Sequence, residues 1–227
     1  MSDRAVTERR RRTLFLAGLA VIAVAVSPPL DAVTGRRLSA HMVQHLLFML
    51  VAAPLMAAAR PVRPANRLLM HPVVVLTLAV GGFWAWHLPR AYEAALSNPF
   101  VHMAEHATFL GGAFLFWTIV FDPGPRRRLG LGATCGFVFA AMLVNIWLAA
   151  ALAFSTTPLY AVYAARAGAA AALADQQLAG VIMWLPADLV YFVTLLALLR
   201  RILRDLDARM PRRIAPEELA RSAEADR

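Results

Sequence analysis

Apolar residues form six continuous stretches along the chain, and most polar residues lie between them. The stretches cover residues 14–30, 42–59, 72–88, 100–121, 131–154 and 178–199. A helix needs ~20 mostly apolar residues to cross the hydrocarbon core of a bilayer. The pattern therefore predicts an all-α integral membrane protein, built as a six-helix transmembrane bundle over residues 14–200.

The composition of the 227-residue chain agrees with burial in lipid, because 60% of its residues are hydrophobic and only 16% are charged. Soluble domains carry about 25% charged residues, so the composition argues against a water-soluble enzyme. Cys135 is the only cysteine, which excludes an intrachain disulfide and a CxxC metal site. No nucleophile–base pair is evident either, and we therefore do not expect an enzyme.

The basic residues alternate between the two sides of the predicted bundle. All 23 are arginines, and 19 of them fall in the N-terminal arm, the second-to-third connection, the fourth-to-fifth connection and the C-terminal tail. The positive-inside rule then predicts that both termini lie in the cytoplasm, with an arm over residues 1–13 and a tail over residues 201–227. The net charge of +9 is an orientation signal, and we expect the lipid bilayer rather than nucleic acid as a partner.

The first apolar stretch allows two interpretations. It is short and follows an arginine cluster, which is also typical of a cleaved signal peptide. Pro28 and Pro29 extend the apolar stretch, and we therefore expect an uncleaved first span.

Five of the six histidines fall at the outer ends of three consecutive spans. They are His41, His45, His87, His102 and His106. The sixth, His71, is interpreted as a helix-start residue before Pro72 on the cytoplasmic side. A histidine inside a span costs free energy, and histidines that occur there are therefore usually functional. The topology thus predicts five imidazoles at one depth, and the alternative is a set of ordinary interface histidines.

The histidine spacing favours a shared metal site. The pairs His41/His45 and His102/His106 are each four residues apart, which puts both rings of a pair on one helical face. Neutral imidazole is the commonest metal ligand, and imidazole with thioether suits copper, the cuprous ion in particular. The candidate soft or supporting residues are Met42, Met103, Glu105 and Asp175. Asp175 alternatively caps the sixth helix.

Other polar and aromatic residues also lie in or near the spans. Asn145 and Asp188 are near the middle of the fifth and sixth spans, and their depth predicts a mutual contact. Such a pair makes either a structural hydrogen bond or a proton- or ion-handling site. Trp84, Trp86 and Tyr92 surround the outer end of the third span, where we expect an aromatic interface belt.

Four segments between residues 38 and 191 resemble the CtaG family of cytochrome c oxidase assembly proteins, in the same order. The segments are His41-Met42-Val43-Gln44-His45-Leu46-Leu47 with Ala53-Pro54, Trp86-His87-Leu88-Pro89 with Tyr92, Glu105-His106 with Phe109-Leu110, and Asp175-Gln176-Gln177-Leu178-Ala179-Gly180 with Met183-Trp184. Together these motifs are specific, whereas each alone would be weak. Members of the family often have an extra span, whereas this chain is predicted to have six.

The resemblance implies a role in making a haem-copper oxidase functional in the bacterial plasma membrane. It implies a copper-handling step, with cytochrome c oxidase subunits and periplasmic copper chaperones as partners. Joined to the histidine pattern, it predicts a metallochaperone that takes copper at its outer face. Two alternatives stay open: a membrane cytochrome that binds haem b through two of these imidazoles, and a copper transporter with a path along Asn145, Asp188 and Pro186.

Overall fold

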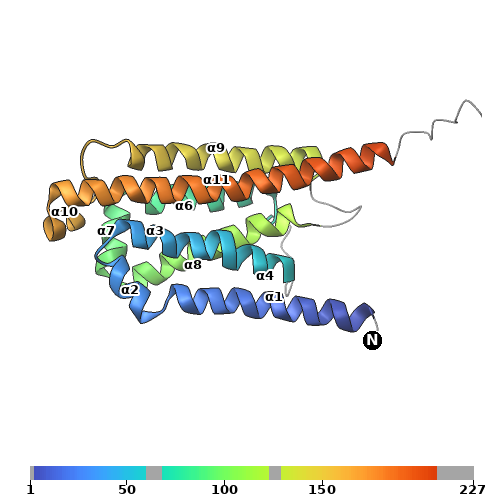
Figure 1. The fold of residues 1–227 in the computed structure, drawn as a ribbon, viewed down its shortest axis with the longest axis horizontal. Coiled ribbons are helices and arrows are strands. Elements are labelled where there is room, and N and C mark those ends of the chain that lie inside the picture. The colour runs from blue at the N-terminus through green and yellow to red at the C-terminus, as the bar shows by residue number, and fades with distance from the viewer. Residues whose placement is uncertain (1–2, 60–67, 123–128, 209–227) are drawn as a thin grey trace, which may run out of the picture.

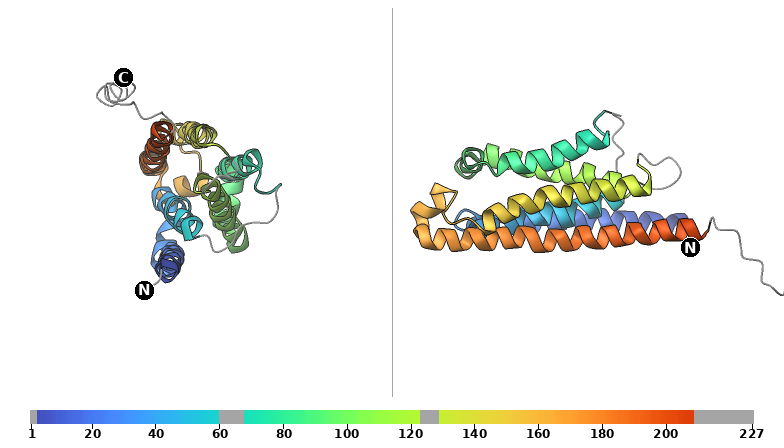
Figure 2. Two further views of the ribbon diagram at one scale, coloured as in Figure 1. Left: turned by 90° about the vertical axis from the view of Figure 1, so that its right-hand side faces the viewer. Right: turned by 90° about the horizontal axis from the view of Figure 1, so that it is seen from above.

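The computed structural model describes residues 3–59, 68–122 and 129–208, and within these ranges every regular element is a helix. The elements are α1 (Asp3–Ala25), α2 (Pro28–Thr34), α3 (Leu38–Leu46), η1 (Leu47–Ala52), α4 (Ala53–Ala59), α5 (Pro72–Leu76), η2 (Thr77–Gly81), α6 (Gly82–Trp86), α7 (Pro89–Ser97), α8 (Pro99–Val120), α9 (Leu131–Ala153), α10 (Ala161–Ala167) and α11 (Ala169–Asp207). The segments η1 and η2 are π-helical. The long helices lie side by side along one axis (Figure 1, Figure 2).

The described part of the chain is all-helical, and four to six of its helical segments are long and apolar enough to cross a membrane. The continuous candidates are Leu38–Ala59, Pro99–Val120, Leu131–Ala153 and part of Ala169–Asp207. Two further helix pairs pass the same test but are bent, by 52° between Val6–Ala25 and Pro28–Thr34 and by 76° between Pro72–Trp86 and Pro89–Ser97. The predicted number of six is reached when each bent pair counts as one span.

The two ends of the bundle differ. The short helices α2, α7 and α10 lie together at one end, which we call the histidine end because α3 and α8 begin there (Figure 1). The start of α1 and the end of α11 lie at the opposite end. Thus α1 begins at the end of the bundle opposite to that at which α3 and α8 begin. The predicted arginine-rich connections at residues 60–67 and 123–128, and most of the predicted tail, fall outside the described residues.

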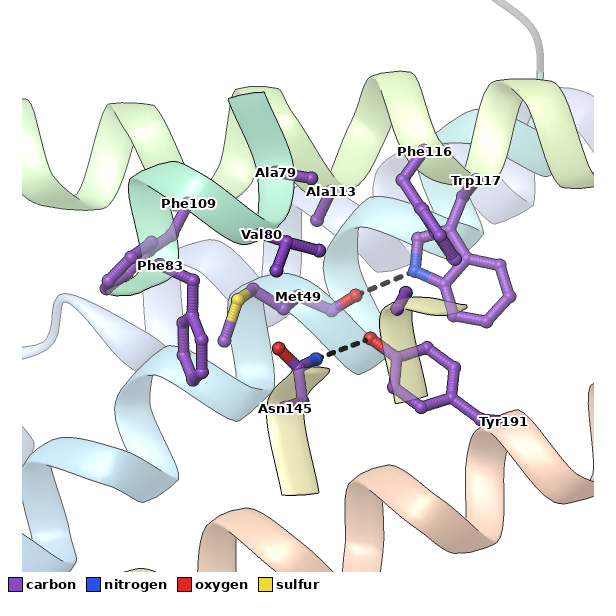
Figure 3. A pocket seen from close by; sticks show the side chains of 11 residues that line it. Met49, Ala79, Val80, Phe83, Phe109, Ala113, Phe116, Trp117, Asn145 and Tyr191 are labelled. Atoms are coloured by element: carbon purple, nitrogen blue, oxygen red, sulfur yellow. Dashed lines mark hydrogen bonds between the residues drawn. The ribbon is translucent and has the colours of Figure 1, made fainter. Parts of the chain in front are cut away.

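Pro54 explains a contact in the middle of the bundle. The amide of Ala53 donates to the Phe48 carbonyl five residues earlier, which is π-helical bonding. In the same pattern the Met49 carbonyl would need the amide of Pro54, and proline has no N–H. The indole Nε1 of Trp117 on α8 donates to that carbonyl at 2.9 Å (Figure 3). The freed acceptor therefore ties the second span to α8.

Helices α9 and α11 form a close pair because of Gly180. A Cβ atom at this position would lie 2.5 Å from the Ala153 nitrogen and 2.7 Å from the Ala149 carbonyl oxygen. Both neighbours are backbone atoms, which cannot rotate away as a flexible side chain can. Only glycine allows this separation, and the close contact fixes α11 against α9.

Candidate metal centre

Two helices contribute the central side chains, and both begin at the histidine end. His41 and His45 lie on α3, while His102, Glu105 and His106 lie on α8. Asn98 caps α8, since its side-chain oxygen accepts from the amides of Phe100 and Val101 at 2.9 and 3.4 Å. The cap and the following proline determine where α8 begins, and so the level of its histidines.

The four imidazoles lie against one another. Ring centroids are 4.3 Å apart for His41 and His45 on α3, and 4.1 Å apart for His102 and His106 on α8. Across the two helices, His41 lies 5.2 Å from His102, and His45 lies 5.5 Å from His106. The two predicted histidine faces therefore point toward each other in the interior of the bundle.

Glu105 lies between the two histidines of α3. One carboxylate oxygen, Oε2, is 3.6 Å from His41 Nε2, and the other, Oε1, is 3.5 Å from His45 Nε2. All three side chains are at most 1% exposed. These separations exceed the ~2.7–3.2 Å of an ordinary N–H···O bond. The carboxylate thus faces both imidazoles without a short hydrogen bond to either.

The cluster holds buried polar atoms that lack hydrogen-bond partners in the described part of the chain. They are Nδ1 and Nε2 of His41 and His45, Nε2 of His102 and His106, and both carboxylate oxygens of Glu105. Buried polar atoms are usually hydrogen-bonded, because desolvation without a partner costs ~1–3 kcal/mol per group. So many exceptions in one place indicate a site built for something other than internal hydrogen bonding.

Four of these residues have the spacing of a metal-ligand set. Donor atoms of His41, His102, Glu105 and His106 all lie within 4.8 Å of one another. Two ligands with bonds of ~2.0–2.1 Å to one metal lie at most ~4.1 Å apart, and ~3.3 Å apart in a tetrahedral site. Closing the widest pair thus requires a movement of roughly 0.7 Å if the two ligands lie opposite each other, and of roughly 1.5 Å in a tetrahedral site. Three imidazoles and a carboxylate fit a transition-metal ion in chemistry and in spacing.

Of the other predicted ligands, His87 and Met42 lie inside the bundle, whereas Met103 does not. Nε2 of His87 lies 3.4 Å from the sulfur of Met42, and both residues are buried. Met103 is 61% exposed on α8, so it lies on the outside of the bundle although it follows His102. The sequence alone could not tell an inward thioether from an outward one, because both follow a histidine directly.

Asp175 contacts the start of α3 through Ser39. It lies inside α11, which begins at Ala169, so the alternative that it caps this helix is wrong. Its carboxylate accepts from the Ser39 amide at 3.2 Å and from the Ser39 hydroxyl at 2.5 Å. Ser39 is in the first turn of α3, where amides lack partners within the helix. Asp175 therefore holds the helix that carries His41 and His45.

The next two residues hold the connection before α10. Gln176 accepts from the Leu159 amide at 2.7 Å, and Gln177 donates to the Ser155 carbonyl at 3.1 Å. Both glutamines belong to the motif that resembles the family, but the sequence alone gives neither of them a role. In the structure they tie residues 155–159 to α11.

Three buried tyrosines connect the short helices of the histidine end, and sequence reasoning did not find two of them. Tyr92 of α7 and Tyr163 of α10 join through their hydroxyls at 2.9 Å, and Tyr160 donates to the His87 carbonyl at 2.9 Å. Tyr92 is 1% exposed and its ring lies 5.1 Å from that of His41. The interface-belt interpretation is therefore wrong for Tyr92. Burial raises the pKa of Tyr160 and Tyr163 above its ordinary value, so both remain protonated.

Asn145 and Asp188 each have a partner other than the one expected. Asn145 donates to the Tyr191 hydroxyl at 3.3 Å (Figure 3). Asp188 instead has a side-chain hydrogen bond with Trp184. Depth alone suggested that they meet, but rotation about the helix axes decides which side chains face each other. Asn145 and Tyr191 also line a cavity of about 30 Å³, which is large enough for one water molecule.

Comparison with known proteins identifies the family to which this chain belongs. Residues 2–205 match a family model described as the cytochrome c oxidase caa3 assembly factor. An uncharacterized protein of Mycobacterium leprae (strain TN) is 30% identical over 156 residues, which make up 66% of this chain and 23% of that protein. The chain thus spans less than a quarter of the length of this relative. No solved structure matches the chain.

Proposed function

Because the chain belongs to the cytochrome c oxidase caa3 assembly factor family, we propose that it is a membrane-embedded assembly factor that binds and delivers copper. The copper ion is its cargo, and the protein acts on it by binding and release rather than by catalysis. The binding site is the cluster of His41, His45, His102, Glu105 and His106. The partners are cytochrome c oxidase subunits, with periplasmic copper chaperones as the source of the ion.

The proposal includes an orientation in the bacterial plasma membrane. Each bent helix pair counts as one span, which gives six spans over residues 14–200 and puts both termini in the cytoplasm. The arginine distribution supports this arrangement, since 19 of the 23 arginines then face the cytoplasm. The arm over residues 1–13 and the tail over residues 201–227 are cytoplasmic segments. The histidine end faces the periplasm, where an incoming ion reaches it without crossing the bilayer.

One observation carries the copper proposal: three imidazoles and a carboxylate have donor atoms within 4.8 Å of one another. Both oxygens of this carboxylate and a nitrogen of each imidazole are buried without a hydrogen-bond partner among the residues that the structure describes. Imidazole nitrogen is a good ligand for copper, and an oxidase assembly factor serves an enzyme that contains copper. His45, on the other side of Glu105, supplies a spare imidazole. A spare ligand suits transfer between proteins, because the ion can exchange one ligand at a time.

Copper content tests the site. Purified full-length protein is loaded with cuprous ion under anaerobic conditions, washed, and its copper content measured by mass spectrometry. We expect bound copper in the wild type and a copper content lower by at least one ion per protein when His41, His45, His102 and His106 are all replaced by alanine. The matched control is His71→Ala, which removes a histidine at the N-cap position of α5 whose side chain makes no capping hydrogen bond. Equal copper in the four-histidine variant and the wild type would refute the site.

Two further measurements address the alternatives. A Soret band from the purified protein would favour a haem-binding cytochrome, and copper uptake into sealed vesicles would favour a transporter. In cells that lack the gene, the wild type should restore oxidase activity, whereas the four-histidine variant should not. Restoration by the variant would separate assembly from copper binding and overturn the delivery step.

A further inference from the structure

His87 and Met42 bring two metal-binding atoms together beside the cluster. Nε2 of His87 lies 3.4 Å from Sδ of Met42. His87 is 5% exposed and Met42 is 0% exposed. They come from different spans, since His87 ends α6 and Met42 belongs to α3. A contact between two potential ligands, shielded from solvent, therefore joins the second and third spans.

The second ring nitrogen of His87 decides the nature of this contact. Nδ1 lies 2.7 Å from the Phe83 carbonyl oxygen, which can only accept a hydrogen bond. Nδ1 therefore carries the hydrogen, and in the neutral imidazole Nε2 is left with a lone pair. Methionine sulfur has no hydrogen to donate. The Nε2–Sδ contact thus brings two lone pairs face to face in a buried position, an arrangement that a cation between them would stabilise.

We propose that His87 and Met42 form a separate copper subsite that takes the cuprous ion, next to the imidazole–carboxylate cluster. This inference rests on the proposed copper function. Thioether sulfur is a soft ligand that selects the cuprous ion, whereas the cluster offers a carboxylate and no sulfur. The protein therefore presents two neighbouring sites of different ligand hardness.

Distances permit one ion to reach both atoms. With bonds of ~2.0 Å to nitrogen and ~2.3 Å to sulfur, the values known for zinc, a 3.4 Å separation gives an N–metal–S angle of roughly 105°. This angle leaves the opposite side of the ion free for a third ligand. The fixed Nδ1–H also holds the ring so that Nε2 keeps facing the sulfur.

Helix geometry keeps the two sites apart. His41 and Met42 are adjacent in α3, and adjacent residues of a helix point in directions ~100° apart. His41 faces the cluster on α8, whereas Met42 faces His87 at the end of α6. One turn of α3 thus contributes a ligand to each site, and an ion moving between them stays next to the same helix.

X-ray absorption at the copper edge tests the subsite, because it detects sulfur bound to copper. Full-length protein is loaded anaerobically with cuprous ion. We expect a sulfur neighbour of copper at ~2.3 Å in the wild type. In Met42→Leu we expect this neighbour to be absent and the protein to bind one copper ion fewer. Leucine conserves the volume of methionine. The matched control is Met103→Leu, since Met103 is 61% exposed on α8 and should leave the sulfur signal unchanged.

A second variant pair separates the two sites. Replacing His102 and His106 by alanine should lower the copper content but keep the sulfur signal, because neither residue belongs to the subsite. His87→Gln should remove the sulfur signal as Met42→Leu does, which covers the case in which one variant does not fold.

The possible failures are distinguishable. Wild type that binds copper without a sulfur neighbour overturns the subsite and leaves the cluster standing. A sulfur signal that survives in Met42→Leu assigns it to another methionine and also overturns the subsite. Wild type that binds no copper refutes both the subsite and the proposed function.

Discussion

The histidine end of the bundle and the core around Trp117 and Tyr191 bury polar groups in opposite ways. In the core, the Trp117 indole donates to a carbonyl that Pro54 leaves free, and Asn145 donates to Tyr191. At the histidine end, both oxygens of Glu105 and six ring nitrogens of the four surrounding histidines are buried without hydrogen-bond partners in the described chain. The side-chain oxygen of Asn145 has no hydrogen-bond partner in the described chain, but Asn145 lines a cavity with room for a water molecule.

This difference indicates that the core serves to pack the helices, whereas the cluster is suited to binding a cation. Protein groups satisfy most of the polar atoms of the core, so the core stabilises the fold by itself. The cluster instead brings a carboxylate and four imidazoles together at a cost in folding free energy, which a bound cation would offset. Four substitutions test this contrast, and they follow in order of decreasing expected effect.

Gly180→Ala should have the largest effect, because it disturbs the helix pair that supports both regions. The added Cβ would lie 2.5 Å from the Ala153 nitrogen and force α9 and α11 apart. We expect a loss of about 3 kcal/mol in unfolding free energy, measured by denaturation in detergent, together with weaker copper binding. Gly136→Ala on α9 is the control, since a Cβ there meets nothing within 4 Å. Equal stability of the two variants would contradict the close α9–α11 contact.

Glu105→Gln should affect the two properties in opposite directions. Copper affinity should fall by more than the ~10–100-fold typical of losing a group that only supports a ligand. The metal-free variant should be more stable, by about 1 kcal/mol or ~2–4 °C in Tm, because a buried carboxylate without a short hydrogen bond is removed. Copper titration and thermal unfolding of the metal-free protein measure both. A variant less stable than the wild type would show that the carboxylate is already satisfied by the protein.

Asp175→Asn should weaken copper binding by about 10-fold while the number of bound ions stays the same. The carboxylate holds the first turn of α3 through Ser39, so its loss lets His41 and His45 move. The control is Gln177→Ala, which removes a contact to Ser155 away from α3. If Asp175→Asn instead removes one bound ion, Asp175 is itself a ligand.

Tyr191→Phe should have the smallest effect and no effect on copper. It removes the hydroxyl that accepts from Asn145 and should cost about 0.5–1.5 kcal/mol of stability. Thermal unfolding measures the loss, and copper titration should match the wild type. A change in copper affinity would mean that the core and the histidine end are coupled.

Periodicity and residue type determined much of this protein in advance. Continuous apolar stretches can satisfy their backbone in lipid only as helices, so helical spans followed directly from the sequence. The family was also readable, because its motifs occur in order. The i, i+4 spacing put His41 with His45 and His102 with His106, since helical geometry alone fixes which side of a helix a residue takes. The sidedness drawn from the arginines is still a prediction.

Tertiary structure decided which faces meet. Nothing in the spacing of Glu105 tells that its carboxylate lies between His41 and His45, because that depends on the rotation and depth of α8 against α3. The same is true of Met42, which faces His87, and of Met103, which faces outward. Asp175 and Ser39 are 136 residues apart in sequence and meet only through the docking of α11. Local sequence fixes the direction of a side chain on its own helix, whereas the packing of all helices together selects its partner.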